Sequence, residues 1–315
     1  MDSLAPVLSL VIPLYRSEEN LPRLFRELSA LAPRIPAPFE VVFVIDGSPD
    51  HCDRVLAQSA PALPFPVQTV HLSRNFGAFS AITAGLQQGR GAYFTVIAAD
   101  LQEPPELMIQ FLELMMTDQA DIVFGKRDKR ADPVLSSAAS RIFWSLYRRF
   151  INPEMPEGGV DVFGCTAQVR DQLMRFNEAD TSLVSLLFWV GFRRAFVPYS
   201  RAARQEGKSA WTFAKKLRYS VNTVFNFTDL PIRVLIFTGI LGILSSIVVS
   251  TLILIARAAG WIQVPGYTPI VLSIFFFGGL TTLGLGTVGQ YVWLCLQNAR
   301  ARPTFIISGV DRYGK

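Results

Sequence analysis

Residues 40–48 read Glu-Val-Val-Phe-Val-Ile-Asp-Gly-Ser, an apolar run that ends in an acid and a turn. A continuous run of β-branched and aromatic residues is typical of a strand that is buried on both faces of a parallel sheet. The following Asp46-Gly47-Ser48-Pro49 is turn chemistry, because aspartate, glycine and proline each favour turn backbone. The stretch therefore predicts a central strand with Asp46 at its carboxyl end.

The same pattern of a short apolar run followed by a helical segment recurs along the first part of the chain. Strands are predicted at 8–13, 40–45, 67–72, 93–98 and 122–125. Helices are predicted after Ser17, over 78–88, and from Pro104-Pro105, since proline suits a first helical turn. Repeated alternation predicts an α/β domain with a mostly parallel sheet, whose ligands bind at the carboxyl ends of the strands.

From about residue 209 the composition changes, and 234–256 and 270–296 carry no charged residue. About 23 helical residues cover a ~30 Å hydrocarbon layer, so two transmembrane helices are predicted, with buried core helices as the alternative. Basic residues on the outer flanks predict that both flanks lie in the cytoplasm. Segments 134–151 and 211–227 mix aromatic and basic residues and are predicted as interfacial helices, with ordinary domain packing as the alternative.

These patterns divide the chain into four parts. They are a cytoplasmic domain over 1–208, a juxtamembrane amphipathic helix over 209–232, a two-helix transmembrane region over 233–299 and a cytoplasmic C-terminal tail over 300–315. The mean hydropathy of +0.32 over 315 residues indicates that part of the chain does not face water.

Composition excludes several classes of protein. The net charge of +5 suits anionic lipid or a phosphorylated substrate, whereas no nucleic-acid-binding motif is present. The three cysteines are far apart, which argues against a disulfide framework or a structural zinc site and for a reducing compartment. The chain begins without a signal-peptide pattern, so the first domain is expected to stay in the cytoplasm.

Two further stretches carry candidate chemistry. Residues 98–106 read Ala-Ala-Asp-Leu-Gln-Glu-Pro-Pro-Glu, in which Asp100 and Gln102 offer the oxygen ligands that Mg²⁺ or Mn²⁺ prefers. A helix N-cap is the alternative role for Asp100. A basic run just before the apolar spans contains Arg201, Arg204 and Ser209. These residues could bind a phosphate at the bilayer surface, or the run could bind anionic lipid head groups.

Together these stretches resemble the family-two glycosyltransferases of the GT-A (Rossmann-like) fold. The polyprenyl-phosphate branch, which includes dolichol-phosphate mannose synthase and the bacterial undecaprenyl-phosphate glycosyltransferases, is the most similar. The resemblance covers nearly the whole chain. The stretches that carry it are Val11-Ile12-Pro13-Leu14-Tyr15, Glu18-Glu19-Asn20-Leu21, Val44-Ile45-Asp46-Gly47-Ser48, Leu72-Ser73-Arg74-Asn75-Phe76-Gly77, Ala84-Gly85-Leu86, Asp100-Leu101-Gln102-Glu103-Pro104-Pro105 and the Arg-x-x-Arg-x-x-Gly-x-Ser run over 201–209.

The resemblance implies a role for each matching residue. Asp100 and Gln102 hold a Mg²⁺ or Mn²⁺ ion and through it the donor diphosphate. Asp161 lies near the reacting carbon and with Asp100 makes up the catalytic pair. The expected nucleotide-binding residues are Pro13, Tyr15, Glu19, Asp46, Arg74 and Asn75, and the expected phosphate-binding residues are Arg201, Arg204 and Ser209.

Three positions depart from the family pattern. Ala98 stands where the family often has the first acid of Asp-Ala-Asp, which puts metal affinity in question. Ile45 replaces the first acid of Asp-Asp-Gly-Ser, and Cys165 stands where some relatives have an acid. Asp161 is then the nearest carboxylate to that last position.

The implied reaction is transfer of a sugar from a nucleotide donor, with uridine favoured by family frequency, to polyprenyl (undecaprenyl) phosphate. A phosphate monoester with a second pKa of about 6 is already largely anionic at neutral pH. Direct attack with inversion is therefore expected, and Asp161 is expected to orient groups and not to serve as an obligatory base.

The implied location is the bacterial inner membrane, with the catalytic domain and both termini cytoplasmic and a homo-oligomer possible. A processive polysaccharide synthase of the same fold is one alternative, although Gln290-Tyr291-Val292-Trp293 lacks the arginine of its Gln-x-x-Arg-Trp signature. A catalytically silent membrane scaffold is the other alternative.

Overall fold

A computed structural model describes residues 6–127, 145, 148–149, 153–156, 160–176, 178, 182–201, 230–259 and 267–314. The chain forms two compact units. The first consists of Met1–Lys216 with Pro303–Lys315, and the second of Leu217–Arg302.

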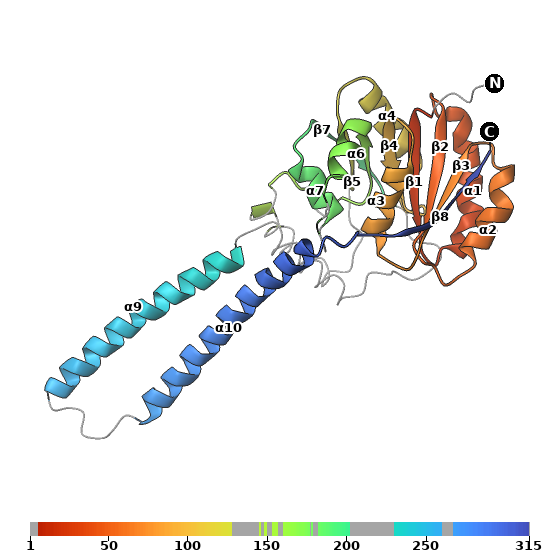
Figure 1. Cartoon of the computed structure of the whole chain (residues 1–315). Coiled ribbons are helices and arrows are strands. Elements are labelled where there is room, and N and C mark those ends of the chain that lie inside the picture. The colour runs from red at the N-terminus through yellow and green to blue at the C-terminus, as the bar shows by residue number, and fades with distance from the viewer. Residues whose placement is uncertain are drawn as a thin grey trace. The chain divides into compact units, whose positions relative to one another are not determined.

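The described part of the first unit contains one eight-stranded sheet in the order β7-β5-β6-β4-β1-β2-β3-β8 (Figure 1). Its strands are β1 (Leu8–Leu14), β2 (Phe39–Ile45), β3 (Val67–Leu72), β4 (Tyr93–Val96), β5 (Ile122–Arg127), β6 (Phe163–Thr166), β7 (Arg194–Tyr199) and β8 (Ile307–Tyr313). The five strands predicted from the sequence are confirmed, with small shifts at their ends.

The middle of the sheet is parallel, as the apolar runs predicted. β1 pairs in parallel with β2 and β4, and β2 pairs in parallel with β3. All seven residues of β1 are apolar except Ser9, and six of them are buried. Burial on both faces of the sheet explains why these strands read as continuous apolar runs and not as alternating ones.

The sheet as a whole is mixed: four of its seven pairings are parallel, including that of β5 with β7, and three are antiparallel, so the expected mostly parallel sheet is confirmed in part. β6 lies antiparallel between β4 and β5, and β8 lies antiparallel to β3. The expected tail over 300–315 therefore contains an edge strand of the first unit. Its partner, β3, is far away in the sequence, so no local pattern marked the pairing.

Helices cover both faces of the parallel strands. Leu10, Ile12 and Leu14 share one buried cluster with α1 (Leu21–Leu31) and α2 (Cys52–Ser59). Side chains alternate along a strand, so Val11 points to the other face, where α3 (Ala78–Gln88) packs. A Cβ at Gly85 would lie 2.3 Å from Val11 Cγ1, so only glycine allows α3 to approach this closely.

Shorter helices cover the other half of the sheet. Leu107, Phe111 and Met115 of α4 pack with Val123 of β5 and Val197 of β7 in a second buried cluster. The bounds are α4 (Leu107–Met116), α6 (Ala167–Leu173) and α7 (Leu183–Trp189), with single-turn helices at η1 (Glu18–Asn20), η2 (Ala32–Arg34) and η3 (Ala60–Ala62).

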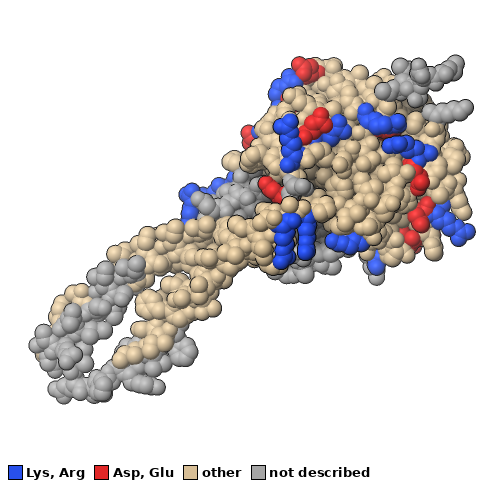
Figure 2. Space-filling model, viewed as in Figure 1, with Lys and Arg blue, Asp and Glu red and all other residues tan. Residues whose placement is uncertain are grey.

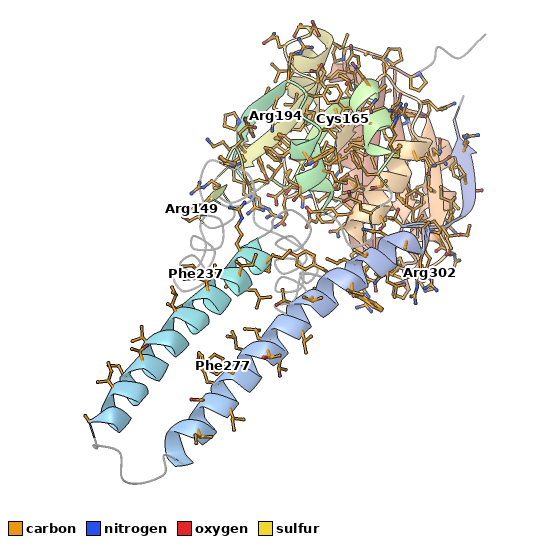
Figure 3. All side chains as sticks on the ribbon, turned by 60° about the vertical axis from the view of Figure 1, so that its left-hand side comes forward. Arg149, Cys165, Arg194, Phe237, Phe277 and Arg302 are labelled. Carbon is orange, nitrogen blue, oxygen red and sulfur yellow. The ribbon has the colours of Figure 1, made fainter. Side chains whose placement is uncertain are left out.

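The second unit contains two long helices, α9 (Leu230–Ala258) and α10 (Tyr267–Ala299). They run antiparallel, because Phe277 of α10 lies against Gly242 of α9 and Leu235 of α9 lies against Gly284 of α10. Figure 2 shows that the described surface of both helices is neither acidic nor basic over most of its length. Figure 3 labels Phe237 and Phe277, which are 68% and 41% exposed.

The helical structure of 234–256 and 270–296 is confirmed. Among the described residues, however, no helix is long and apolar enough to cross a membrane. The two transmembrane helices stay a prediction. The interfacial helices predicted at 134–151 and 211–227 fall almost entirely outside the described residues.

Candidate active site

Asp46 lies at the carboxyl end of β2 and joins two loops. Its carboxylate is 2% exposed and accepts hydrogen bonds from the backbone N–H groups of Phe76, at 2.7 Å, and Gly77, at 2.9 Å. The Asn75 side chain donates to the Asp46 carbonyl at 3.2 Å. Burial raises the pKa of Asp46, while the two backbone N–H groups and Arg74 oppose the rise. The loop after β2 is thereby tied to residues 73–77 after β3.

Gly47 allows these two loops to touch. Its φ is +53°, and a Cβ there would lie 2.3 Å from the carbonyl carbon of Arg74 and 2.4 Å from the backbone nitrogen of Asn75. A side chain would therefore be strained and would push the 73–77 loop away. The Asp-Gly pair is required by the contact between the loops as well as by the turn.

The loop after β1 is tied to the same place. Ser48 Oγ accepts the backbone N–H of Arg16 at 2.7 Å and donates to Asp50 at 2.6 Å. Asp50 accepts the backbone N–H of Glu18 at 2.9 Å, and Glu18 accepts that of His51 at 3.0 Å. Ser48 and Asp50 therefore act in the described structure as links between the loops after β1 and β2.

The residues predicted to bind the nucleotide all lie at or near these three loops. Pro13 is in β1 beside Val44, Tyr15 is 36% exposed, and Glu19 is exposed in η1. The Arg74 guanidinium lies 3.9 Å from the Phe76 ring centroid and donates to the Asn75 carbonyl at 2.9 Å. The carboxyl ends of β1, β2 and β3 thus bring the predicted set to one edge of the sheet, and contact with a nucleotide stays a prediction.

A second group of polar side chains lies beyond the carboxyl end of β4, next to β1 in the sheet. Asp100 Oδ1 accepts the backbone N–H of Gln102 at 3.3 Å, across Leu101, whose φ is +49°. Glu103 follows and is only 1% exposed. A positive φ at a leucine is uncommon and indicates that surrounding contacts hold this turn in place.

Arg201 connects this turn to Asp161. Its Nη2 donates to Gln102 Oε1 at 2.6 Å, its Nε lies 3.4 Å from Glu103 Oε1, and its Nη1 lies 3.8 Å from Asp161 Oδ2. The predicted residues Gln102, Asp161 and Arg201 are therefore brought together from three distant parts of the sequence. Arg204 and Ser209 lie outside the described residues.

Two residues that the sequence did not reveal hold Asp161. Arg127, at the end of β5, and Tyr199, at the end of β7, both donate to Asp161 Oδ2, the tyrosine at 2.9 Å. Burial lowers the pKa of Arg127, but the Asp161 charge together with the hydrogen bonds to Asp161 and Tyr199 outweighs burial, and the net shift is upward. The signal in the sequence that could have identified both residues is that each is a polar residue at the end of a strand. We call Gln102, Glu103, Arg127, Asp161, Tyr199 and Arg201 the Arg201 cluster.

Glu103 is the most perturbed acid of the cluster. Burial raises its pKa to about 7; Arg201 opposes this rise, and the Asp161 and Asp100 charges add to it. Its Oε2 is buried and has no hydrogen-bond partner among the described residues. An acid that titrates near neutral pH is typical of functional sites.

Two of the positions that depart from the family pattern are buried. Ile45 is 5% exposed and belongs to the core cluster under α1. Cys165, labelled in Figure 3, is fully buried in β6, and burial raises the pKa of its thiol to about 12. Both side chains are therefore part of the packed interior.

The oxygen atoms in the turn after β4 are of the kind that bind a hard divalent cation. Asp100, Gln102 and Glu103 offer carboxylate and amide oxygens, the ligands of Mg²⁺ and Mn²⁺. Among the described residues, no group of three or more His, Cys, Asp or Glu side chains could hold a metal ion. Gln102 Oε1 accepts from Arg201, so metal binding there requires Arg201 to move.

Comparisons with known proteins agree with this geometry. The model of glycosyl transferase family 2 matches residues 9–175. A bactoprenol glucosyl transferase of Shigella phage SfV is 28% identical over 95% of this chain and 97% of its own length. An undecaprenyl-phosphate 4-deoxy-4-formamido-L-arabinose transferase of Klebsiella pneumoniae is 28% identical over 96% and 93%.

One solved structure supports the GT-A-like fold. Glucosyl-3-phosphoglycerate synthase from Mycobacterium tuberculosis, in complex with Mn²⁺, uridine diphosphate and phosphoglyceric acid, has a TM-score of 0.51. The match is 13% identical and covers 70% of this chain and 76% of that one, so it concerns the fold.

Replacing Asp46 with Asn should lower the free energy of unfolding by about 1–3 kcal/mol, because the buried amide would have one acceptor oxygen for the two N–H groups that the carboxylate now accepts. Denaturant unfolding of the full-length protein measures this, with the exposed Asp53→Asn as the matched control. If Asp46→Asn weakens nucleotide binding at unchanged stability, its main role is contact with the base.

Glu103→Gln should flatten the dependence of stability on pH. The folded pKa of about 7 exceeds the ordinary 4.5, so between these values the native state keeps a proton that the unfolded state releases. The free energy of unfolding then falls as pH rises, by on the order of 3 kcal/mol between pH 5 and pH 8. Unfolding at both pH values with a chelator present measures it; an equal pH dependence in the variant contradicts the assignment.

Proposed function

The chain belongs to glycosyl transferase family 2, and we propose that it moves one sugar from a nucleotide donor to the phosphate of a polyprenyl lipid, with inversion at the anomeric carbon. The observation that carries the proposal is the position of the Arg201 cluster. It lies at the carboxyl ends of β4, β5 and β7, in the same sheet as the loops predicted to hold the nucleotide. Near-full-length similarity to transferases named for bactoprenol and undecaprenyl phosphate supports the lipid acceptor.

The donor is held along the edge formed by β4, β1, β2 and β3. Pro13, Tyr15, Glu19, Asp46, Arg74 and Asn75 bind the nucleotide, which we take to be uridine diphosphate. Asp100 and Gln102 hold Mg²⁺ or Mn²⁺, and this cation offsets charge on the donor diphosphate when bound. Arg201, Arg204 and Ser209 contact the donor or acceptor phosphates.

The acceptor needs alignment more than activation. A phosphate monoester with a second pKa of about 6 is largely dianionic at neutral pH, so the enzyme has little need to remove a proton. Arg127 and Tyr199 fix one oxygen of Asp161, which suits a carboxylate that orients sugar hydroxyls or acceptor and does not move. The attacking oxygen forms its bond to the anomeric carbon as the bond to the nucleoside diphosphate breaks.

A membrane location agrees with the acceptor. α9 and α10 expose large apolar side chains, among them Phe237, Ile274 and Leu285 at 68%, 66% and 68%. Exposed apolar surface of this kind marks contact with lipid or protein. We propose that the two helices anchor the chain in the bacterial inner membrane, with both termini in the cytoplasm and copies able to associate.

The direct test is transfer from radiolabelled UDP-glucose, with other nucleotide sugars in parallel, to undecaprenyl phosphate by the purified full-length protein. One sugar per lipid with inverted configuration is the expected product. A polymer would indicate a processive synthase, absence of any product a silent scaffold, and a product with retained configuration would exclude direct attack.

Asp100 and Asp161 should respond differently to substitution. Asp100→Ala should lower turnover by about 10³-fold or more, since diphosphate binding depends on it. Asp161→Asn should leave measurable turnover, lowered by about 10–100-fold, since the acceptor is already anionic. Initial rates with the preferred donor measure this, with the exposed Asp53→Ala as control; equal and complete loss in both variants would contradict the division of roles.

A further inference from the structure

We propose that the C-terminal strand β8 is a positioning element of the donor site, because it holds the start of the 73–77 loop that carries Arg74 and Asn75. The inference rests on the proposed function, which assigns these two residues to the nucleotide. It concerns the last residues of the chain, which follow α10 in the sequence and none of which the sequence linked to the donor.

β8 pairs with β3 along its length. Val67 lies opposite Tyr313, Val70 opposite Val310, and Leu72 opposite Ile307. The register shifts between His71 and Leu72, where β3 ends and the loop begins. An irregularity of this kind changes the direction of the strand and commonly occurs beside functional sites.

The contacts between the two segments concentrate at that end. The backbone N–H of Ser73 donates to the Ile306 carbonyl at 2.9 Å, which extends the pairing into the loop. Ser308 Oγ donates to the His71 carbonyl at 3.1 Å, and His71 Nε2 lies 3.0 Å from Asp311 Oδ2. Backbone and side chains of the C-terminal segment thus fix the residues that lead into the loop.

The other end of the loop is fixed by Asp46, which accepts the N–H groups of Phe76 and Gly77. Arg74 and Asn75 therefore lie between two anchors, Ile306 on one side and Asp46 on the other. Without β8, β3 would be the edge of the sheet, and the start of the 73–77 loop would lose the bond to Ile306 and be held only through the pairing of β3 with β2. Segments with few anchors open locally at low free-energy cost, and binding then has to order them again.

Substitution with proline at two adjacent positions of β8 tests this arrangement in the full-length protein. Neighbouring N–H groups of a strand point to opposite sides, so one of Val310→Pro and Asp311→Pro must remove a bond to β3. That variant should bind UDP at least tenfold more weakly and raise KM for UDP-glucose in proportion, with kcat changed less than threefold. The matched control is Val310→Thr, which keeps the N–H and the branched side chain. It should bind UDP with wild-type affinity.

Hydrogen exchange at the amides of 73–77 gives a second measurement that needs no ligand. The same proline variant should exchange these amides at least tenfold faster than the wild type. The proposal is overturned if both proline variants retain affinity for UDP within twofold and unchanged exchange in the loop. It is also overturned if kcat falls by more than threefold while KM for UDP-glucose stays unchanged.

A milder pair covers the case in which proline unfolds the protein. Ser308→Ala with Asp311→Ala removes the two side-chain contacts and leaves the backbone pairing in place. This double variant should weaken UDP binding about threefold and speed exchange at 73–77. No change in either measurement would count against β8. If the wild type binds neither UDP-glucose nor GDP-mannose, the proposed function fails, while exchange in the loop still decides the role of β8.

Discussion

The buried carboxylate of Asp46 holds the loop after β3 against the loop after β2. The position of the residues predicted to bind the nucleotide depends on this contact. Two backbone N–H groups of the neighbouring loop donate to its two oxygens. A carboxylate provides two acceptors in one plane, and no neutral side chain of the same size does so. Asp46 follows a strand that is buried from Glu40 to Ile45, so the loop that it holds is attached to the interior of the sheet.

The Arg201 cluster obeys a different constraint, the balance of charge. Burial raises the pKa of Glu103, and the nearby charges of Asp161 and Asp100 add to the rise. Arg127 and Arg201 offset that repulsion, each from an element distant in sequence from the acids. Arg201 also belongs to the basic run that leads toward the apolar helices, so one side chain connects the acidic turn with the start of that run.

The second unit depends on a different kind of contact, the packing of one helix against another. Where its two helices meet, Gly242 of α9 lies against Phe277 of α10 and Gly284 of α10 lies against Leu235 of α9. Glycines opposite bulky side chains let the two backbones approach closely. The chain then returns to the first unit, where β8 covers the edge of β3. The sheet is therefore completed by residues that follow the helices in sequence, and β8 replaces β3 as the strand at that edge.

The sequence by itself determined the parallel centre of the sheet, the ranges of α3, α9 and α10, and the edge at which the polar residues gather. These features follow from local periodicity and from turn residues such as Asp46 and Gly47, whose preferences act within a few neighbours. Only the tertiary structure decided the antiparallel β6 and β8, the anchoring of Asp161 by Arg127 and Tyr199, and the burial of Glu103. Each of these depends on pairing or desolvation between segments far apart in the chain, and such pairing leaves no periodic trace in either segment alone.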